Sequence, residues 1–561
     1  MQDATNSATK KSCLLIIMLL AFMQNAYSDD RIISRFEALQ SGYPVTIGDS
    51  PLNAWAALAQ FYEARNYQPA WTSPAAQDEL LKAINEISDE GLIPSDYHQA
   101  ALRDIIQRSQ EDTNPELPTD LDLIFSDAFL LLASHLLEGK VNPQTIDAEW
   151  TANRRQRQLH IVLAEALQSG QVYQTLQSLK PPAPAYHRLA SYRRQLSALL
   201  GRPWPLHEAG PTIRPGDSDP RLPAIRQQLI LLGDLPVPDN DAQHELGSSP
   251  VNQLYTGNLI QAIPAFQARH GLDPDGIIGR KTLATLNMMP IERIRQVDAN
   301  LERWRWLPDS LGDTYVLVNI AGFDMVMVEN GEEVLHQRVI VGGPFRQTPV
   351  FSDRIRYLVF NPTWTVPRTL MIQDQLPRIK SDPGYLKRMN FKVYKGWGAN
   401  RVEIDPAEVK WASLSSDNFP YQLVQQPGPS NSLGQVKFMF PNKHAVYLHD
   451  TPGQYHFSRL ERTISSGCIR VERPFELAER LLVGNSSWNH DNITQARELK
   501  EPVNVVLNKP VPVHLQYWTT WVDKFGNLQI REDVYGRDRR LIDALRSDAQ
   551  GNLQLTPRSK R

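Results

Sequence analysis

The sequence has few cysteines, little net charge and no long apolar run. Only Cys13 and Cys468 occur among its 561 residues, so no disulfide framework can form. The formal net charge of −3 excludes the strongly basic character of proteins that bind nucleic acid or anionic membranes. The apolar run from Cys13 to Met23 covers about half of the ~20 residues that a membrane-spanning helix needs, and later segments are no better suited.

The N-terminal segment has the order of parts found in a secretory signal peptide. Lys10 and Lys11 precede the apolar run, and Ala26-Tyr27-Ser28 places small residues before a cut at Asp29. Residues 1–28 are therefore predicted to be a signal peptide; the alternative is an uncleaved anchor. Cleavage removes Cys13 and leaves Cys468 as a single thiol in an oxidising compartment. Composition alone favours an inert buried cysteine, whereas the sequence around Cys468 favours a reactive one.

The length and the changes of pattern predict a multidomain α+β protein. Residues 29–210 have helical periodicity and no catalytic constellation, which indicates a helical scaffold domain. A Pro/Gly/Asp-rich linker at 210–220 precedes a small three-helix unit at 221–289. Short strands from 293 to 510 predict a β-rich, sandwich- or barrel-like catalytic domain with a capping insertion at about 371–435. Residues 511–561 are predicted to form a β/helical extension.

The segment Ser466-Gly467-Cys468-Ile469-Arg470 carries the sharpest chemical signal. Its glycine-containing turn can present backbone N–H groups to an oxyanion. In an extended chain, alternation places the thiol and the guanidinium on one face, where the cation is expected to lower the thiol pKa. Arg470 is also a natural partner for a substrate carboxylate.

His449 is the best candidate for a general base. Alternation along Ala445-Val-Tyr-Leu-His places Tyr447 and His449 on one face of a predicted strand. Asp450 would point the other way, so a Cys-His-Asp triad is not expected, and a backbone carbonyl is an equally good group to orient the imidazole.

Two other chemistries are weighed against the thiol. A zinc site would draw on imidazoles near the cysteine, but their spacings match no standard zinc signature; the residues are His444, His449, His456 and Cys468. A serine mechanism at Ser466 is less favoured than a thiol beside a plausible base.

His449 together with Ser466-Gly467-Cys468-Ile469-Arg470 resembles the catalytic motif of the L,D-transpeptidases, the YkuD-type domain. Further segments are similar to the large multidomain members of Gram-negative bacteria: Asn300–Pro308, Asn361–Pro367, Pro427–Gly434 and Phe440-Pro-Asn. The unit at 221–289 resembles the peptidoglycan-binding domain 1 family in Ala265-Phe266-Gln267, Gly271-Leu272, Asp275–Gly279 and Thr282. One departure is Pro264, inside the expected central helix.

The resemblance implies a cysteine acyltransferase of the periplasm that acts in peptidoglycan biosynthesis and cell-wall organisation and is a carbapenem target. Cys468 would form a thioester with a tetrapeptide donor, His449 would act as base and then acid, and an acceptor stem would resolve the thioester to a 3→3 crosslink. Ser466, Gly467, Arg470 and Tyr447 would stabilise the oxyanion or position substrate. No metal or organic cofactor is implied. Stem peptides are the expected partners, with other cell-wall synthesis proteins beside them and no nucleic acid.

Three alternatives stay open at this point. Water as acceptor would make the protein an L,D-carboxypeptidase, and a protein lysine would make it an enzyme that attaches proteins to peptidoglycan. A non-catalytic wall-binding scaffold is the third.

Overall fold

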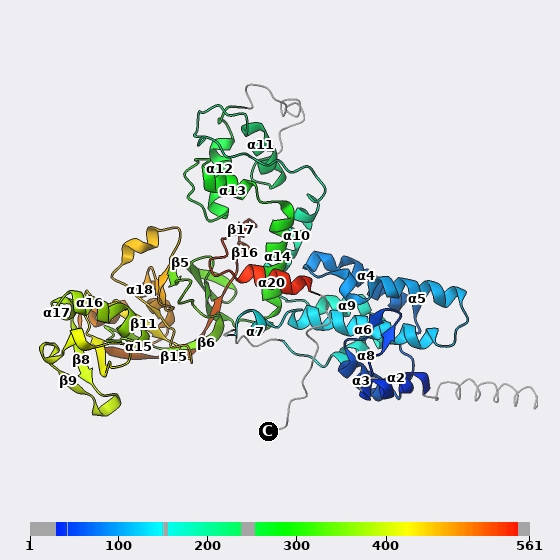
Figure 1. Ribbon diagram of the computed structural model, residues 1–561, viewed down its shortest axis with the longest axis horizontal. Helices are drawn as coiled ribbons and strands as arrows, with labels where there is room; N and C mark the ends of the chain where they lie inside the picture. Colours follow the sequence, from blue (N-terminus) through cyan, green and yellow to red (C-terminus); the bar gives the residue numbers. More distant parts are fainter. Residues whose placement is uncertain (1–29, 42, 149, 151–154, 237–252, 548–561) are drawn as a thin grey trace, which may run out of the picture.

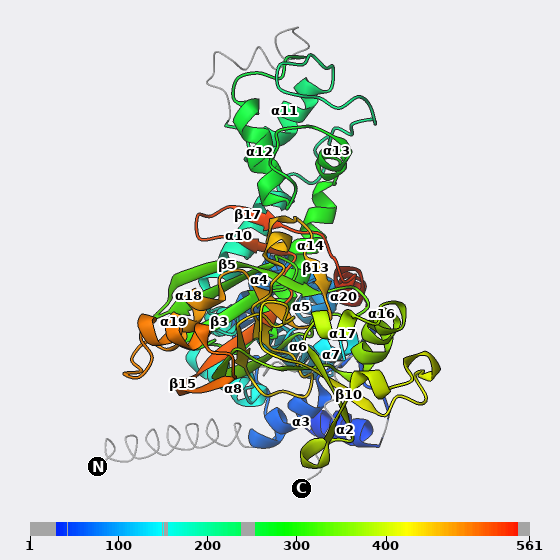
Figure 2. The same ribbon diagram turned by 90° about the vertical axis from the view of Figure 1, so that its left-hand side faces the viewer.

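The computed structural model describes residues 30–41, 43–148, 150, 155–236 and 253–547. The predicted signal peptide, the apolar run included, lies outside these residues. Three lobes meet around the long helix α14 (Pro290–Arg305), with the small helical unit standing apart above the other two (Figures 1 and 2). None of the described helices is both long and apolar enough to cross a membrane.

The N-terminal lobe is all helical apart from a two-stranded hairpin, β1 (Thr46–Ile47) and β2 (Ser50–Pro51). Its centre is α6 (Leu117–Glu138), which is buried on nearly every side because apolar residues predominate all around its second half. The helices around it are α2 (Asp30–Gln40), α3 (Trp55–Ala64), α4 (Pro74–Glu86), α5 (Gln99–Glu111), α8 (Leu159–Ser169) and α9 (Val172–Ser178). Of the other two helices, α7 (Pro143–Ile146) packs on the C-terminal helix at 537–546, and α10 (Pro184–Ser197) packs on α14.

The small unit consists of α11 (Leu222–Leu231), α12 (Leu259–Arg269) and α13 (Arg280–Leu286). Pro264 is accommodated within α12. The segment predicted to be a linker belongs to this unit, because Ile213 forms a β-bridge with Ile278 and Ser218 forms one with Leu254. The sequence missed this because a single bridge leaves no periodic pattern.

Buried charges join the lobes at α14. The Arg305 guanidinium donates to Glu302 at 2.8 Å, and both side chains are fully buried. Glu302 also accepts the N–H of Val141 from the N-terminal lobe at 2.7 Å. On the other side, Arg303 pairs with Asp538 of α20 (Arg537–Arg546) at 2.6 Å. Breaking such a pair would strand a buried charge, so the junction is held firmly.

The catalytic lobe is built on a nine-stranded sheet that closes into a barrel. The strand order is β13-β5-β14-β12-β11-β6-β15-β3-β4, and β4 pairs again with β5. Helices α18 (Pro474–Leu481) and α19 (His490–Glu498) pack on it. The strands are β3 (Thr314–Asn319), β4 (Asp324–Glu329), β5 (Glu332–Gly342), β6 (Phe351–Phe360), β11 (Val436–Met439), β12 (Leu448–His449), β13 (Thr463–Ser465), β14 (Ile469–Val471) and β15 (Val503–Gln516). The α+β prediction with a barrel-like catalytic domain is confirmed.

Two regions differ from the sequence-based expectation. The predicted boundary at 510/511 falls inside β15, whose residues 511–515 pair with β6, so this part of the expected extension is a central strand. The hairpin β16 (Thr520–Val522) and β17 (Leu528–Ile530) then packs on the core shared with the small unit.

The expected capping insertion is a folded subdomain with its own core, and it begins at 364 rather than 371. Its sheet has the order β7-β10-β8-β9. Its elements are β7 (Trp364–Thr365), α15 (Arg368–Leu370), α16 (Leu376–Ser381), α17 (Tyr385–Arg388), β8 (Phe391–Lys395), β9 (Val402–Ile404) and β10 (Tyr421–Gln425).

Candidate active site

The predicted nucleophile and base lie on adjacent parallel strands. Leu448 of β12 pairs with Ile469 of β14, and His449 pairs with Arg470. Because Leu448 and Ile469 are fully buried in the core, alternation turns His449 and Arg470 to the opposite face of the sheet. Tyr447 and Cys468 lie two residues before His449 and Arg470, so alternation turns their side chains to the same face. The four residues expected to gather do so.

A clamped turn presents the thiol. Gly467 has φ +112°, a conformation that an L side chain rarely adopts. The Ser465 hydroxyl accepts the N–H of Gly467 at 3.1 Å and donates to the carbonyl of Cys468 at 2.5 Å. Thr348 donates to the carbonyl of Gly467 at 2.8 Å. These bonds fix the backbone before substrate arrives.

The hydrogen bonds that hold this turn differ from the prediction that Ser466 and Gly467 stabilise the oxyanion. The N–H of Gly467 is occupied by Ser465, so it does not face an incoming oxyanion. The hydroxyl of Ser466 accepts a hydrogen bond from Arg346 at 3.2 Å. Within the described chain the backbone N–H groups of Ser466 and Cys468 have no hydrogen-bond partner, and the Cys468 N–H belongs to the residue that carries the thiol, so it is the donor nearest the attacking sulfur along the chain.

Burial has a larger effect on the pKa of the Cys468 thiol than the neighbouring cations have. Cys468 is partly buried, with its Sγ 3.8 Å from the carbonyl of Ala445. Desolvation raises the pKa of Cys468, and the Tyr447 hydrogen bonds, Arg470 and Lys437 offset it only in part. The expected lowering of the pKa by Arg470 is therefore present but outweighed. At neutral pH the resting group is a thiol.

His449 is held as a neutral base. Its Nδ1 donates to the backbone carbonyl of Asp450 at 2.5 Å, which leaves Nε2 as the atom that can take a proton. Burial, reinforced by Arg470 and Lys437, lowers the pKa of His449 to about 3. The Asp450 carboxylate instead accepts from Gln435 and Thr451 backbone N–H groups, so it does not complete a Cys-His-Asp triad.

No hydrogen bond joins the Cys468 thiol to the imidazole within the described residues. In the sheet register Cys468 is a diagonal neighbour of His449 on the adjacent strand. Rotation of the thiol away from Ala445 toward the imidazole would bring the two groups together, as expected of a site that tightens only when substrate binds.

Sequence reasoning missed two basic residues of the site. Lys437 of β11 pairs with His449, and its ammonium lies 5.7 Å from the centre of the Tyr447 ring. A lysine within the apolar strand Val436–Met439 was the available signal. Arg346, in the loop after β5, gave no such signal because its partners come from distant segments.

Arg346 connects the catalytic turn with the insertion. Its guanidinium forms a bidentate ion pair with Asp374 at 2.6 and 3.0 Å and also reaches Ser466. Tyr447 contacts Trp364 of β7 as well as Cys468. The insertion therefore touches the catalytic face at two points, which suits a cap over the site.

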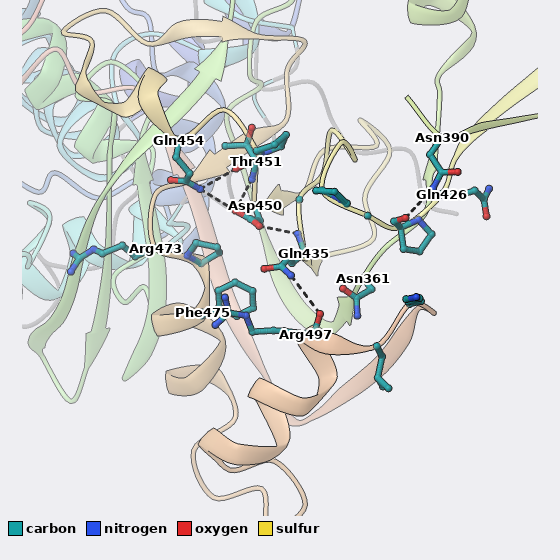
Figure 3. A pocket seen from close by; sticks show the side chains of 18 of the residues that line it. Asn361, Asn390, Gln426, Gln435, Asp450, Thr451, Gln454, Arg473, Phe475 and Arg497 are labelled. Carbon is teal, nitrogen blue, oxygen red and sulfur yellow. Dashed lines mark hydrogen bonds between the residues drawn. The ribbon is translucent and has the colours of Figure 1, made fainter. Parts of the chain in front are cut away.

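A cavity of about 1080 Å³ opens beyond the ends of β12 and β14. Its wall combines the catalytic lobe with Asn390 and Gln426 of the insertion, and Asp450 lies at its centre in hydrogen bonds with Gln435, Thr451 and Gln454 (Figure 3). Neither Cys468 nor His449 lines it. The reaction centre is thus beside the cavity rather than within it.

The imidazoles and thiol weighed as zinc ligands do not converge. In the part of the chain that the structure describes, no group of three or more histidine, cysteine, aspartate or glutamate side chains could hold a metal ion. His444 packs on the ring of Phe351, and the His456 ring lies tilted against that of Tyr455.

Comparison with known proteins matches three regions of the chain to domain families. Residues 313–505 match the L,D-transpeptidase catalytic domain, 218–286 the "Putative peptidoglycan binding domain", and 56–192 the scaffold domain. The "Putative L,D-transpeptidase" of Haemophilus influenzae is 34% identical over 310 residues. That match spans 54% of this chain and 59% of the relative, so the chain spans less than two thirds of its length.

Two solved L,D-transpeptidases are similar only locally. That of Mycobacterium smegmatis is 13% identical with a TM-score of 0.17, covering 36% of this chain and 58% of that one. That of Xylanimonas cellulosilytica is 15% identical with a TM-score of 0.16, covering 55% of this chain and all of that one. Likeness at this level decides nothing about this chain.

Proposed function

Because the chain carries an L,D-transpeptidase catalytic domain at residues 313–505, we propose that it forms 3→3 crosslinks between peptidoglycan stem peptides through a thioester on Cys468. The observation that carries the proposal is the shared face of Cys468, Tyr447, His449 and Arg470 within that domain. The matched peptidoglycan-binding region supports the same substrate, and substrate and domains together favour an extracytoplasmic, periplasmic location.

The proposed reaction begins with proton transfer from the Cys468 thiol to Nε2 of His449. The sulfur attacks the carbonyl of the third residue of a tetrapeptide donor, and the Cys468 N–H stabilises the oxyanion. The amide C–N bond breaks, His449 returns its proton to the leaving amine, and D-alanine departs. The side-chain amine of an acceptor stem then attacks the thioester, its proton passes to His449, and the thiol is restored.

Muropeptide analysis tests this activity directly. Cells or purified sacculi exposed to the wild type should gain 3→3 crosslinked dimers, whereas Cys468→Ala and His449→Ala should yield none above background. Crosslinks formed by Cys468→Ala would overturn the assignment of the nucleophile. Free tripeptides in place of dimers would show that water is the acceptor and that the protein is an L,D-carboxypeptidase.

A thiol-specific probe separates the enzyme from a non-catalytic scaffold. Incubation with a carbapenem should add the drug's mass to the wild type and to Lys509→Met, an exposed lysine on β15. The Cys468→Ala variant should stay unmodified. An adduct that survives that substitution would place the reactive group elsewhere.

The insertion is proposed to exclude water from the thioester. Val436 pairs with Phe360 and the N–H of Asn361 donates to the carbonyl of Gln435, so the chain leaves and re-enters the barrel at adjacent positions. A short hairpin turn can therefore replace the subdomain. The shortened protein should release more tripeptide relative to dimer than the full chain, and an unchanged ratio would refute the role of the cap.

A further inference from the structure

Two cations flank the imidazole in one row across the sheet. Lys437 of β11 pairs with His449 of β12, and His449 pairs with Arg470 of β14. Cross-strand partners project to the same face of a sheet, so the ammonium, the imidazole and the guanidinium stand side by side. The row lies one step along the strands from Tyr447 and Cys468.

Neither cation has an anionic partner among the described residues. No ion pair or hydrogen bond engages the Lys437 ammonium or the Arg470 guanidinium, and Nε of Arg470 is buried without a partner. The groups whose negative charge acts on them are Cys468 for both and Tyr455 for Arg470, with no aspartate or glutamate. Both side chains are partly buried, and this burial lowers their pKa.

Partly buried, unpaired cations are costly, and buried arginines elsewhere in the described chain have partners. Arg303 and Arg305 pair with the carboxylates of Asp538 and Glu302, whereas Arg293 and Arg462 donate to backbone carbonyls. The row beside the thiol departs from that rule. An anion that arrives from outside would complete it, and a carboxylate matches the fork of an arginine and the charge of a lysine.

We propose that Lys437 and Arg470 bind the terminal carboxylate of the donor peptide, so that the site selects a stem ending one residue beyond the carbonyl that Cys468 attacks. This inference rests on the proposed function and adds the feature of the donor that the site recognises. A stem with one further residue carries its carboxylate farther from the scissile bond and would leave the two cations unpaired.

The chemistry of the leaving group supports this assignment. The amine of the departing D-alanine and its carboxylate are attached to the same carbon. A carboxylate held by the cations on either side of His449 therefore brings the amine nitrogen to the imidazole that must protonate it. The C–S bond forms, the C–N bond breaks, and the proton taken from the thiol leaves on that amine.

Binding of the donor peptide also raises the proton affinity of His449. In the free protein, the groups facing His449 on the sheet are Lys437 and Arg470, with Cys468 and Tyr447 one step away, and both cations oppose an imidazolium. A bound carboxylate offsets those two charges and raises the affinity of His449 for a proton. The imidazole is then a competent base only when a carboxylate-terminated donor is present.

Two donor peptides that differ in one group test the inference. The first is a tetrapeptide stem ending in D-alanine, and the second is the same stem ending in D-alaninamide, which removes the charge and keeps the shape. The measured quantity is kcat/KM for release of D-alanine or D-alaninamide. The wild type should prefer the carboxylate donor by about 100-fold, since each charge-assisted contact contributes roughly tenfold or more.

Lys437→Met and Arg470→Met should each reduce this preference by about tenfold or more, whereas Lys437→Arg should retain most of it. Lys509→Met, with its exposed lysine on the same sheet, should match the wild type. The pH profile gives a second readout: His449 should titrate at higher pH with the carboxylate donor bound than with the amide.

Equal rates for the two donors in the wild type, or an unchanged preference in both methionine variants, would overturn the inference and leave the proposed function intact. If the folded wild type releases neither D-alanine nor D-alaninamide, the proposed function is overturned, and this inference with it.

Discussion

The resting state of Cys468 gives a prediction that distinguishes this site from a thiolate–imidazolium pair. Burial raises the pKa of the thiol, and burial with two nearby cations lowers the pKa of His449 to about 3. Between pH 5 and 8 both groups are therefore neutral. An ion pair would require the opposite order of the two pKa values.

The magnitude follows from the titration curve. Below the pKa of a thiol, the fraction present as thiolate falls tenfold for each unit of pH. Alkylation by iodoacetamide should therefore rise about 1000-fold between pH 5 and 8. A preformed ion pair would alkylate at a nearly constant rate over this range. Lys437 and Arg470 both favour the thiolate, so Lys437→Met and Arg470→Met should react more slowly than the wild type at pH 7.

The assay is the pseudo-first-order rate of carboxamidomethylation at Cys468, followed by mass spectrometry on peptides. The Cys468→Ala variant corrects for any reaction at Cys13 in uncleaved protein. A rate that is flat between pH 5 and 8 in the wild type, and becomes pH-dependent in His449→Gln, would refute the neutral resting state.

Three further perturbations probe the support of the site. His449 is neutral when folded and has an ordinary pKa near 6.5 when unfolded, so acidification favours the unfolded chain. Lowering the pH from 7 to 4.5 should reduce the free energy of unfolding, measured in urea, by about 2.5 kcal/mol more in the wild type than in His449→Gln, and parallel losses would contradict the lowered pKa. At Gly434, with φ +61°, an added Cβ would lie 2.3 Å from Oδ2 of Asp450. Gly434→Ala should lower the free energy of unfolding by about 1–3 kcal/mol and slow carbapenem acylation; wild-type values in calorimetry and in the acylation time course would show that the turn tolerates a side chain. The Arg346–Asp374 pair is about one-third exposed, so Arg346→Ala should change stability by less than about 1 kcal/mol, yet it should speed proteolytic cleavage of the insertion; cleavage at the rate of Arg388→Ala, which removes an exposed pair within the insertion, would exclude a link between cap and turn.

Much of the catalytic face could be predicted because the alternation of side chains along a strand depends only on local sequence. Alternation along a strand depends only on backbone geometry, so Tyr447 with His449 and Cys468 with Arg470 could be assigned to shared faces before any fold was known. The helical N-terminal lobe and the strand-rich catalytic lobe were predicted from periodicity for the same reason. The orientation of the imidazole by a backbone carbonyl was left open beside other choices, since which carbonyl lies near a ring depends on the fold.

Residue types and their spacing were enough to predict the chemical type of the site: a thiol in a tight glycine turn, with an imidazole and a guanidinium at fixed strand positions. The tertiary structure decided how those groups behave. It placed Lys437 beside His449, engaged the N–H of Gly467, and buried Cys468 deeply enough to reverse the expected direction of its pKa shift. These outcomes depend on which strands lie side by side and how much water remains between them, and neither is encoded in the spacing of residues along one segment.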